Sequence, residues 1–210
     1  RLGAYDFIQK PVTPHQLTAV LERAIKYRKL VLDNQRYQSH LEVMVREKNA
    51  ERNDPYFIDY PARVAQVQKA MAAAGIDVYL GSRLRTASWL TDAFCPWRTY
   101  VVVPKKGLPT VFTFVIDAAR VADDSWLDED HVLGYAPMGG MDQVSLIADF
   151  IREELGIKRG RIGVENGLSN YLPEGVLTHF EYQQFEAALA GCRLVDAYDI
   201  IDRLSLIKDE

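Results

Sequence analysis

The clearest structural signal in this sequence of 210 residues is the stretch Tyr100-Val-Val-Val-Pro-Lys-Lys-Gly-Leu-Pro-Thr-Val-Phe-Thr-Phe-Val-Ile116. Its first five residues form a short apolar run rich in β-branched side chains, which is typical of a buried strand. Lys105-Lys-Gly-Leu-Pro109 follows as a turn, because Gly and Pro interrupt regular structure. Residues 110–116 then return as the second strand. The stretch therefore predicts a β-hairpin within a sheet.

Helix and strand patterns alternate on both sides of the hairpin. Gly75 and Gly156 stand where two of the helices would end. The predicted helices cover 61–74, 85–92, 118–123, 142–155, 173–189 and 198–208, and the other predicted strands cover 76–80, 131–135, 161–165 and 193–197. This order predicts an α/β domain with a mixed sheet and flanking helices.

The first fifty residues carry a different pattern. Residues 5–9 form a short apolar strand pattern that Lys10-Pro11 closes, and no strand pattern precedes it. A lone edge strand cannot satisfy its backbone hydrogen bonds, so we expect the chain to begin inside a domain. Thr13-Pro14 then starts a long helix that no Gly or Pro interrupts before Pro55.

The later part of this long N-terminal helix has apolar residues at seven-residue spacing, which is typical of a coiled coil. A long amphipathic helix lying on its own domain is the alternative. The charged stretch that follows contains Asn53-Asp54-Pro55, a turn or linker signal. We therefore divide the chain into 1–50, a linker at 51–60 and a second domain at 61–210.

The composition limits the classes of function. Its 48% hydrophobic and 26% charged residues are typical of a soluble globular protein, and the net charge of -4 gives no basic surface for nucleic acid. No apolar run approaches the roughly 18 residues that a membrane span needs. Cys95 and Cys192 are too few for a disulfide framework and suit a reducing compartment. We expect a cytoplasmic protein that binds neither nucleic acid nor membrane.

Residues 1 to about 50 resemble the end of a response-regulator receiver domain. The resemblance lies in Gly3-Ala-Tyr-Asp-Phe-Ile-Gln-Lys-Pro-Val-Thr13 and in Leu41-Glu-Val-Met-Val-Arg-Glu-Lys48, which follows the helix. It implies that Lys10 contacts a phosphoryl group, for which an ammonium group is suited, and that Phe7 occupies the conformational switch position. The phospho-accepting aspartate of that family would lie upstream of Arg1. We therefore expect a receiver remnant without phosphorelay activity.

The second domain resembles the N-terminal domain of the creatinase, prolidase and aminopeptidase P family. The matching segments are 63–71, 74–77, Ala87-Ser-Trp-Leu-Thr91, 100–104, Arg161-Ile-Gly-Val-Glu165, 195–197 and Ile207-Lys-Asp-Glu210. The resemblance implies a catalytic domain beyond this sequence, in which Asp, Asp, His, Glu and Glu hold two divalent metal ions that activate water. In this chain we expect no metal site, no cofactor, no catalytic residue and no hydrolysis.

The candidate site is Asp92-Ala-Phe-Cys-Pro-Trp-Arg-Thr-Tyr100. In creatinase-like members the N-terminal domain supplies an arginine that binds a substrate carboxylate and a neighbouring aromatic residue. The resemblance gives these roles to Arg98 and to Trp97 and Phe94, because a guanidinium binds a carboxylate through two hydrogen bonds and a ring can stack on a ligand. Pro96-Trp97 departs from the smaller residues of that family, which argues against a creatine-like substrate. The alternative is that Arg98 pairs with a nearby acid while Trp97 is partly buried core.

Three functions remain open. We favour the non-catalytic, substrate-capping and oligomerising domain of a Xaa-Pro peptidase-like, metal-dependent hydrolase. It would act with the missing catalytic domain and form a homo-oligomer, as a dimer through the long helix or through this domain. The second function is a response-regulator signalling protein in which the receiver controls a creatinase-like output or sensor domain. The third is a binding module that holds a small carboxylate at Arg98.

Overall fold

The computed structural model describes residues 21, 24–29, 58–137, 141–167 and 175–206. The chain divides into two compact units, Arg1–Ile58 and Asp59–Glu210. In the first unit, residues 24–29 are helical and Leu21 and Ile25 are exposed. The predicted strand at 5–9 and linker signal at 53–55 lie outside the described residues, as do Lys10 and Phe7.

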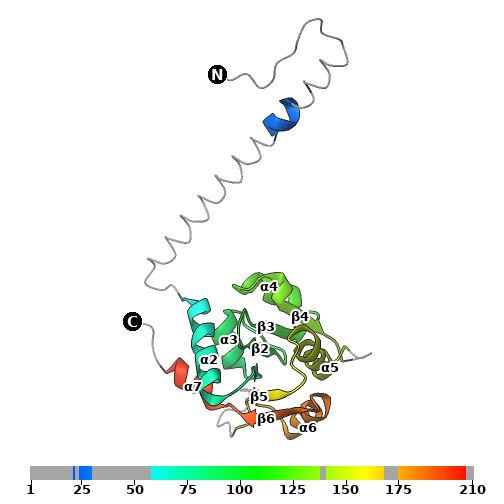
Figure 1. Ribbon diagram of the computed structural model, residues 1–210. Coiled ribbons are helices and arrows are strands. Elements are labelled where there is room, and N and C mark those ends of the chain that lie inside the picture. The colour runs from blue at the N-terminus through cyan, green and yellow to red at the C-terminus, as the bar shows by residue number, and fades with distance from the viewer. Residues whose placement is uncertain (1–20, 22–23, 30–57, 138–140, 168–174, 207–210) are drawn as a thin grey trace, which may run out of the picture. The chain divides into compact units, whose positions relative to one another are not determined.

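Six strands of the second unit form one mixed sheet in the order β4-β3-β2-β1-β5-β6 (Figure 1). They are β1 (Val78–Gly81), β2 (Tyr100–Pro104), β3 (Thr110–Phe114), β4 (Val132–Tyr135), β5 (Gly160–Val164) and β6 (Cys192–Asp196). β2 pairs antiparallel with both of its neighbours, whereas the other neighbouring strands pair in parallel. The start of β2 therefore lies at the same sheet edge as the ends of the other five strands.

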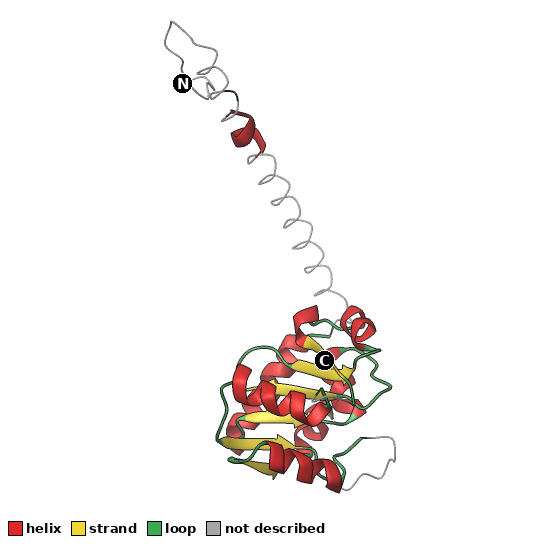
Figure 2. Ribbon diagram, turned by 90° about the vertical axis from the view of Figure 1, so that its right-hand side faces the viewer, coloured by secondary structure: helices red, strands yellow, loops and turns green. Residues whose placement is uncertain are grey.

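Helices cover both faces of this sheet (Figure 2). One layer contains α2 (Tyr60–Ala74), α3 (Leu84–Thr91), α4 (Ala118–Asp124) and α7 (Asp199–Ser205), and the other contains α5 (Gln143–Asp149), its π-helical continuation η2 (Phe150–Glu154) and α6 (His179–Ala188). A short 3₁₀ helix, η1 (Glu129–His131), precedes β4. None of the described helices is long and apolar enough to cross a membrane.

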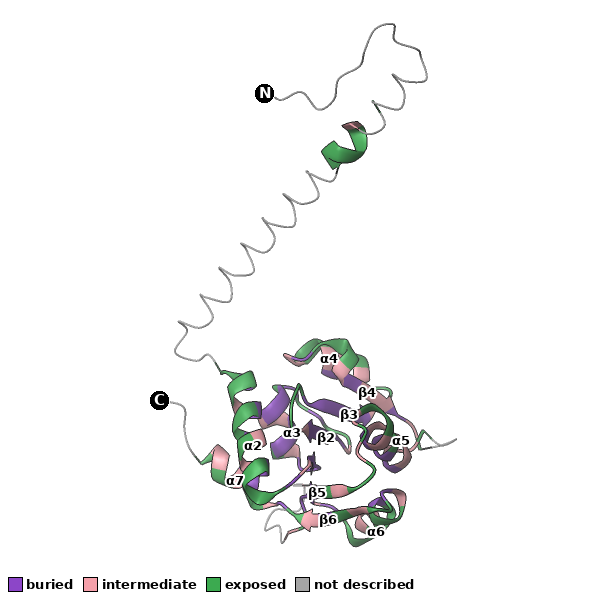
Figure 3. Cartoon of the chain, viewed as in Figure 1, coloured by how far each residue is buried: buried purple, intermediate pink, exposed green. Residues whose placement is uncertain are grey.

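The strands supply side chains to two cores. In β2, Val101 and Val103 pack with the α2 layer, while Tyr100 and Val102 pack with the α5 layer, because successive side chains of a strand point to opposite faces. All four are completely buried, and Figure 3 shows the central strands β2 and β3 largely in the colour of buried residues. The predicted α/β class, mixed sheet and flanking helices are confirmed for this unit.

Most element boundaries match the sequence-based expectation, and the helix expected over 173–189 differs most. Among the described residues this helix starts only at His179, because Thr178 acts as its N-cap in a capping box with Glu181. Gly175 has a positive φ of 83°, a conformation that does not continue into a helix. The non-helical segment 175–178 lies against the candidate site.

Candidate functional site

A fully buried carboxylate lies at the sheet edge where β1 and β5 end. Glu165 accepts hydrogen bonds from the Tyr79 hydroxyl at 2.7 Å, from the backbone N–H groups of Ser82 and Arg83 at 2.6 and 2.8 Å, and from Nε of Arg83 at 2.8 Å. The Thr86 hydroxyl is a further donor. Burying a carboxylate is costly unless it is paired and hydrogen-bonded. These donors together offset that cost.

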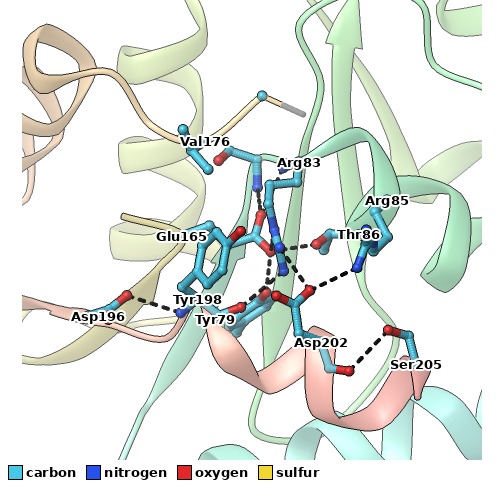
Figure 4. Close-up of polar contacts among 12 residues, drawn as sticks. Tyr79, Arg83, Arg85, Thr86, Glu165, Val176, Asp196, Tyr198, Asp202 and Ser205 are labelled. Carbon is cyan, nitrogen blue, oxygen red and sulfur yellow. Dashed lines mark hydrogen bonds and ion pairs between the residues drawn. The ribbon is translucent and has the colours of Figure 1, made fainter. Parts of the chain in front are cut away.

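The Arg83 guanidinium extends this cluster to the C-terminal helix. Its Nη1 donates to Asp202 at 2.9 Å and its Nη2 to the Tyr198 carbonyl at 3.0 Å, while the group lies 4.2 Å from the centre of the Tyr198 ring. Figure 4 shows Arg83 pointing between Glu165 and Asp202. Burial by itself lowers the pKa of Arg83, but the charge of Glu165 and the hydrogen bonds to Glu165 and Asp202 together outweigh this and raise it. Because the side chain is fully buried, we assign it a structural role.

The predicted site residue Arg98 lies just before β2, at this same edge. Its Nε and Nη2 donate to the two carboxylate oxygens of Glu181, each at 2.8 Å. Nη1 donates to the carbonyl groups of Ser82, at 3.3 Å, and Gly175, and Nη2 also donates to the Val176 carbonyl at 3.3 Å. A guanidinium has five N–H donors, and all five of them have an acceptor within this chain.

Glu181, like Arg98, makes several hydrogen bonds within the chain. The Tyr100 hydroxyl donates to it at 2.6 Å, and the backbone N–H and hydroxyl of Thr178 donate at 2.8 and 2.9 Å. Burial by itself raises the pKa of Glu181, but the Tyr100 hydrogen bond and the Arg98 charge outweigh it, so the pKa lies below its ordinary value. The two side chains form an ion pair whose charges cancel.

A pocket of about 340 Å³ opens beside this ion pair. Its lining comprises Ser82, Leu84, Phe94, Cys95, Pro96, Trp97, Arg98, Thr99 and Gly175. Phe94 and Trp97 are 60% and 49% exposed, and the Trp97 ring packs against that of Phe114 at 5.4 Å. The structure thus brings the three predicted site residues Arg98, Trp97 and Phe94 together around one cavity.

Two polar features of this region were not predicted from the sequence. One is the identity of the acid that pairs with Arg98: the sequence-based alternative had Arg98 paired with a nearby acid, and the structure shows that acid to be Glu181. The other is the buried hydroxyl of Ser82, which has no hydrogen-bond partner among the described residues. The sequence carried a signal only for the capping box, since Thr178 and Glu181 have the required spacing. No group of three or more His, Cys, Asp or Glu residues in the described ranges could hold a metal ion.

A comparison with known protein families identifies the family of this chain. The model of the creatinase/prolidase N-terminal domain matches residues 63–207. This chain belongs to the creatinase/prolidase N-terminal domain family. The match confirms the resemblance inferred for the second domain. It leaves residues 1–62 unmatched, so the receiver resemblance and the roles of Lys10 and Phe7 remain predictions from sequence.

Solved structures show the same fold. A proline dipeptidase from Streptococcus pneumoniae is 18% identical, with a TM-score of 0.55 over 69% of this chain and 98% of that chain. The N-terminal domain of the cytoplasmic peptidase PepQ from Mycobacterium tuberculosis is 20% identical, with a TM-score of 0.52, and the match covers 68% of this chain and 98% of that chain. A search of curated protein sequences found no match.

A longer relative shows how such a domain can be part of a larger protein. The Xaa-Pro dipeptidase from Bacillus anthracis is 18% identical, with a TM-score of 0.58, and the match covers 72% of this chain but only 37% of that one. At these identities the likeness establishes the fold and leaves the activity to be argued from the site.

Proposed function

We propose that this chain is the non-catalytic, substrate-capping domain of a metal-dependent hydrolase similar to the Xaa-Pro peptidases. Its family membership supports this, as do the peptidases among its structural neighbours. The described residues do not form a donor set for a metal ion. The resemblance to this family assigns the two divalent ions of such an enzyme to a separate catalytic domain, where they would activate water.

The observation that carries the proposal is the pair of exposed aromatic rings at the pocket. Phe94 and Trp97 leave much of their apolar surface in water, although burying such a side chain would gain about 1.5–3 kcal/mol. Apolar cavities with a few polar groups are the usual form of small-molecule sites. We assign the pocket to contacts with the substrate of the hydrolase.

A hydrolysis assay and a binding assay test the two parts of this proposal separately. The chain, supplied with Mn²⁺ and a Xaa-Pro peptide, should release no product, and turnover that survives further purification would contradict the non-catalytic role. In a nuclear magnetic resonance titration with the same peptide, the indole N–H signal of Trp97 should shift. The Trp126 indole donates to the Leu90 carbonyl at 2.8 Å and serves as the internal control. An unchanged Trp97 signal would contradict the site.

We also propose a cytoplasmic homo-oligomer. Exposed apolar side chains on the N-terminal helical segment support self-association, since Leu21 and Ile25 are 53% and 67% exposed. Sedimentation equilibrium should give at least twice the monomer mass of 23.9 kDa. A monomer at all concentrations would contradict this part. The alternative of a small-carboxylate binding module is less well supported, because Glu181 already occupies Arg98.

A further inference from the structure

We infer that Glu181 sets the charge selectivity of the pocket, so that the pocket accepts an uncharged apolar ring bearing an amide and discriminates against a free carboxylate. The inference rests on the proposed function, because it names the ligand class of the same pocket. It departs from the resemblance-based role, in which Arg98 would bind a ligand carboxylate, and follows the alternative, in which Arg98 pairs with a nearby acid.

The ion pair between Arg98 and Glu181 already has the geometry that a ligand carboxylate would need. Glu181 uses both carboxylate oxygens on Nε and Nη2 of Arg98, each at 2.8 Å, which is the bidentate arrangement that a ligand carboxylate would adopt. A ligand could bind in that way only by displacing Glu181. The displaced side chain would leave the hydroxyl of the buried Tyr100 without its acceptor, and an unsatisfied buried donor is costly.

Arg98 cannot easily turn toward a ligand. Its remaining N–H groups bind the carbonyl oxygens of Ser82, Gly175 and Val176. The chain is tightly packed here, since a Cβ atom added at Gly175 would lie 3.0 Å from Nη1 of Arg98 and 2.9 Å from the Ser82 carbonyl oxygen. A rotation of Arg98 would break contacts with two separate segments of the chain.

Arg98 is the one charged side chain of the pocket lining among the described residues, and Glu181 cancels that charge at 2.8 Å. A carboxylate that enters this pocket would lose hydration without gaining a free cation, which is unfavourable. An uncharged ring instead gains contact with the exposed faces of Phe94 and Trp97.

Ser82 lines the pocket, is 3% exposed, and its hydroxyl has no hydrogen-bond partner among the described residues. Buried hydroxyl groups normally have a partner. A rotation of the Ser82 side chain that exposes this buried hydroxyl would let a ligand amide bind it as donor or acceptor, and no charge is needed for that. The apolar rings and this hydroxyl together fit an amide-bearing ring.

Two matched ligands test the inference on the 210-residue chain. N-acetyl-prolinamide and N-acetyl-proline have nearly the same size, and at neutral pH they differ in the charge of one group. We expect the Trp97 indole signal to report dissociation constants at least about tenfold lower for the amide. Equal or tighter binding of the carboxylate would overturn the inference and leave the proposed site standing. If neither ligand shifts the Trp97 signal, the proposed site fails and the inference fails with it.

Glu181→Gln tests the assigned residue directly. The substitution keeps the size of the side chain and leaves Arg98 with a net charge, so affinity for N-acetyl-proline should rise at least about tenfold, with little change for the amide. Glu186→Gln removes the same charge from an exposed position of the same helix and should change neither affinity. Unchanged selectivity in a folded Glu181→Gln chain would overturn the inference. If that variant does not fold, the wild-type comparison of the two ligands decides the question alone.

Discussion

Glu165 and Arg98 bind the backbone N–H and the backbone carbonyl of the same residue, Ser82. The Glu165 carboxylate accepts the backbone N–H of Ser82 at 2.6 Å, while Nη1 of Arg98 donates to the Ser82 carbonyl oxygen at 3.3 Å. Because Ser82 lines the pocket, the buried cluster around Glu165 supports one wall of the candidate site. The stability of the fold and the geometry of the pocket are thus coupled through Ser82.

Replacing Glu165 with glutamine should lower the free energy of unfolding by about 3 kcal/mol, because a buried ion pair loses one partner while the other stays buried. Urea unfolding followed by circular dichroism measures the change. The exposed Glu153 provides the control, since Glu153→Gln should stay within about 0.5 kcal/mol of wild type. Equal stability of the two variants would contradict the structural role of Glu165.

Removing the N-cap of α5 should cost about 1 kcal/mol. The Asp142 carboxylate accepts the backbone N–H groups of Val144 and Ser145 at 3.1 and 3.0 Å, and Asp142→Ala leaves both without that acceptor. Asp142→Asn keeps a side-chain oxygen and should retain most of the stability. Thermal unfolding of the two variants tests this, and identical losses would rule out capping as the cause.

Adding a methyl group at Gly167 should destabilise the domain by about 1–3 kcal/mol through overpacking. A Cβ atom at this position would lie 2.5 Å from the Tyr198 ring, whose other contacts include Arg83. The combined variant Gly167→Ala/Tyr198→Ala should lose less stability than the sum of the two single variants, because the clash is then absent. Additive losses in urea unfolding would disprove the clash.

Acid should destabilise the domain through Glu181. Its pKa is lowered from an ordinary value of 4.5, so its contribution to folding is complete above that value and is lost as the pH falls through the folded-state pKa. The free energy of unfolding can be measured by urea titration from about pH 7 to about pH 3. It should decrease once the pH drops below about 4.5. Glu181→Gln should flatten this decline in part, and an unchanged slope would contradict the ion pair.

The sequence was sufficient for the fold because the fold depends on local patterns. The β-branched run at 100–104 and the turn after it predicted β2 and β3, and Gly75 marked the end of α2. The apolar spacing of residues 142–155 did not indicate that this expected helix would end as the π-helix η2. Such a change in hydrogen-bond spacing leaves the apolar spacing almost intact.

The polar partners could not be predicted because they depend on tertiary structure. Arg98 and Glu181 are 83 positions apart, and Arg83 and Glu165 are 82 apart. The sequence left open whether Arg98 would bind a ligand carboxylate or pair with a nearby acid, and the structure shows it paired with Glu181. Trp97 and Phe94 were easier to place at the pocket, because they lie within a few positions of Arg98 in the same segment.

The cavity beside Trp97 is proposed as a ligand site. Isothermal titration calorimetry of the chain with N-acetyl-prolinamide tests it most directly, with Trp97→Ala as the variant and Glu186→Gln as the control. We expect saturable binding to wild type and to the control, and at least about tenfold weaker binding to Trp97→Ala, because the aromatic wall is lost. Binding of equal strength to Trp97→Ala, or no binding to the wild-type chain, would contradict it.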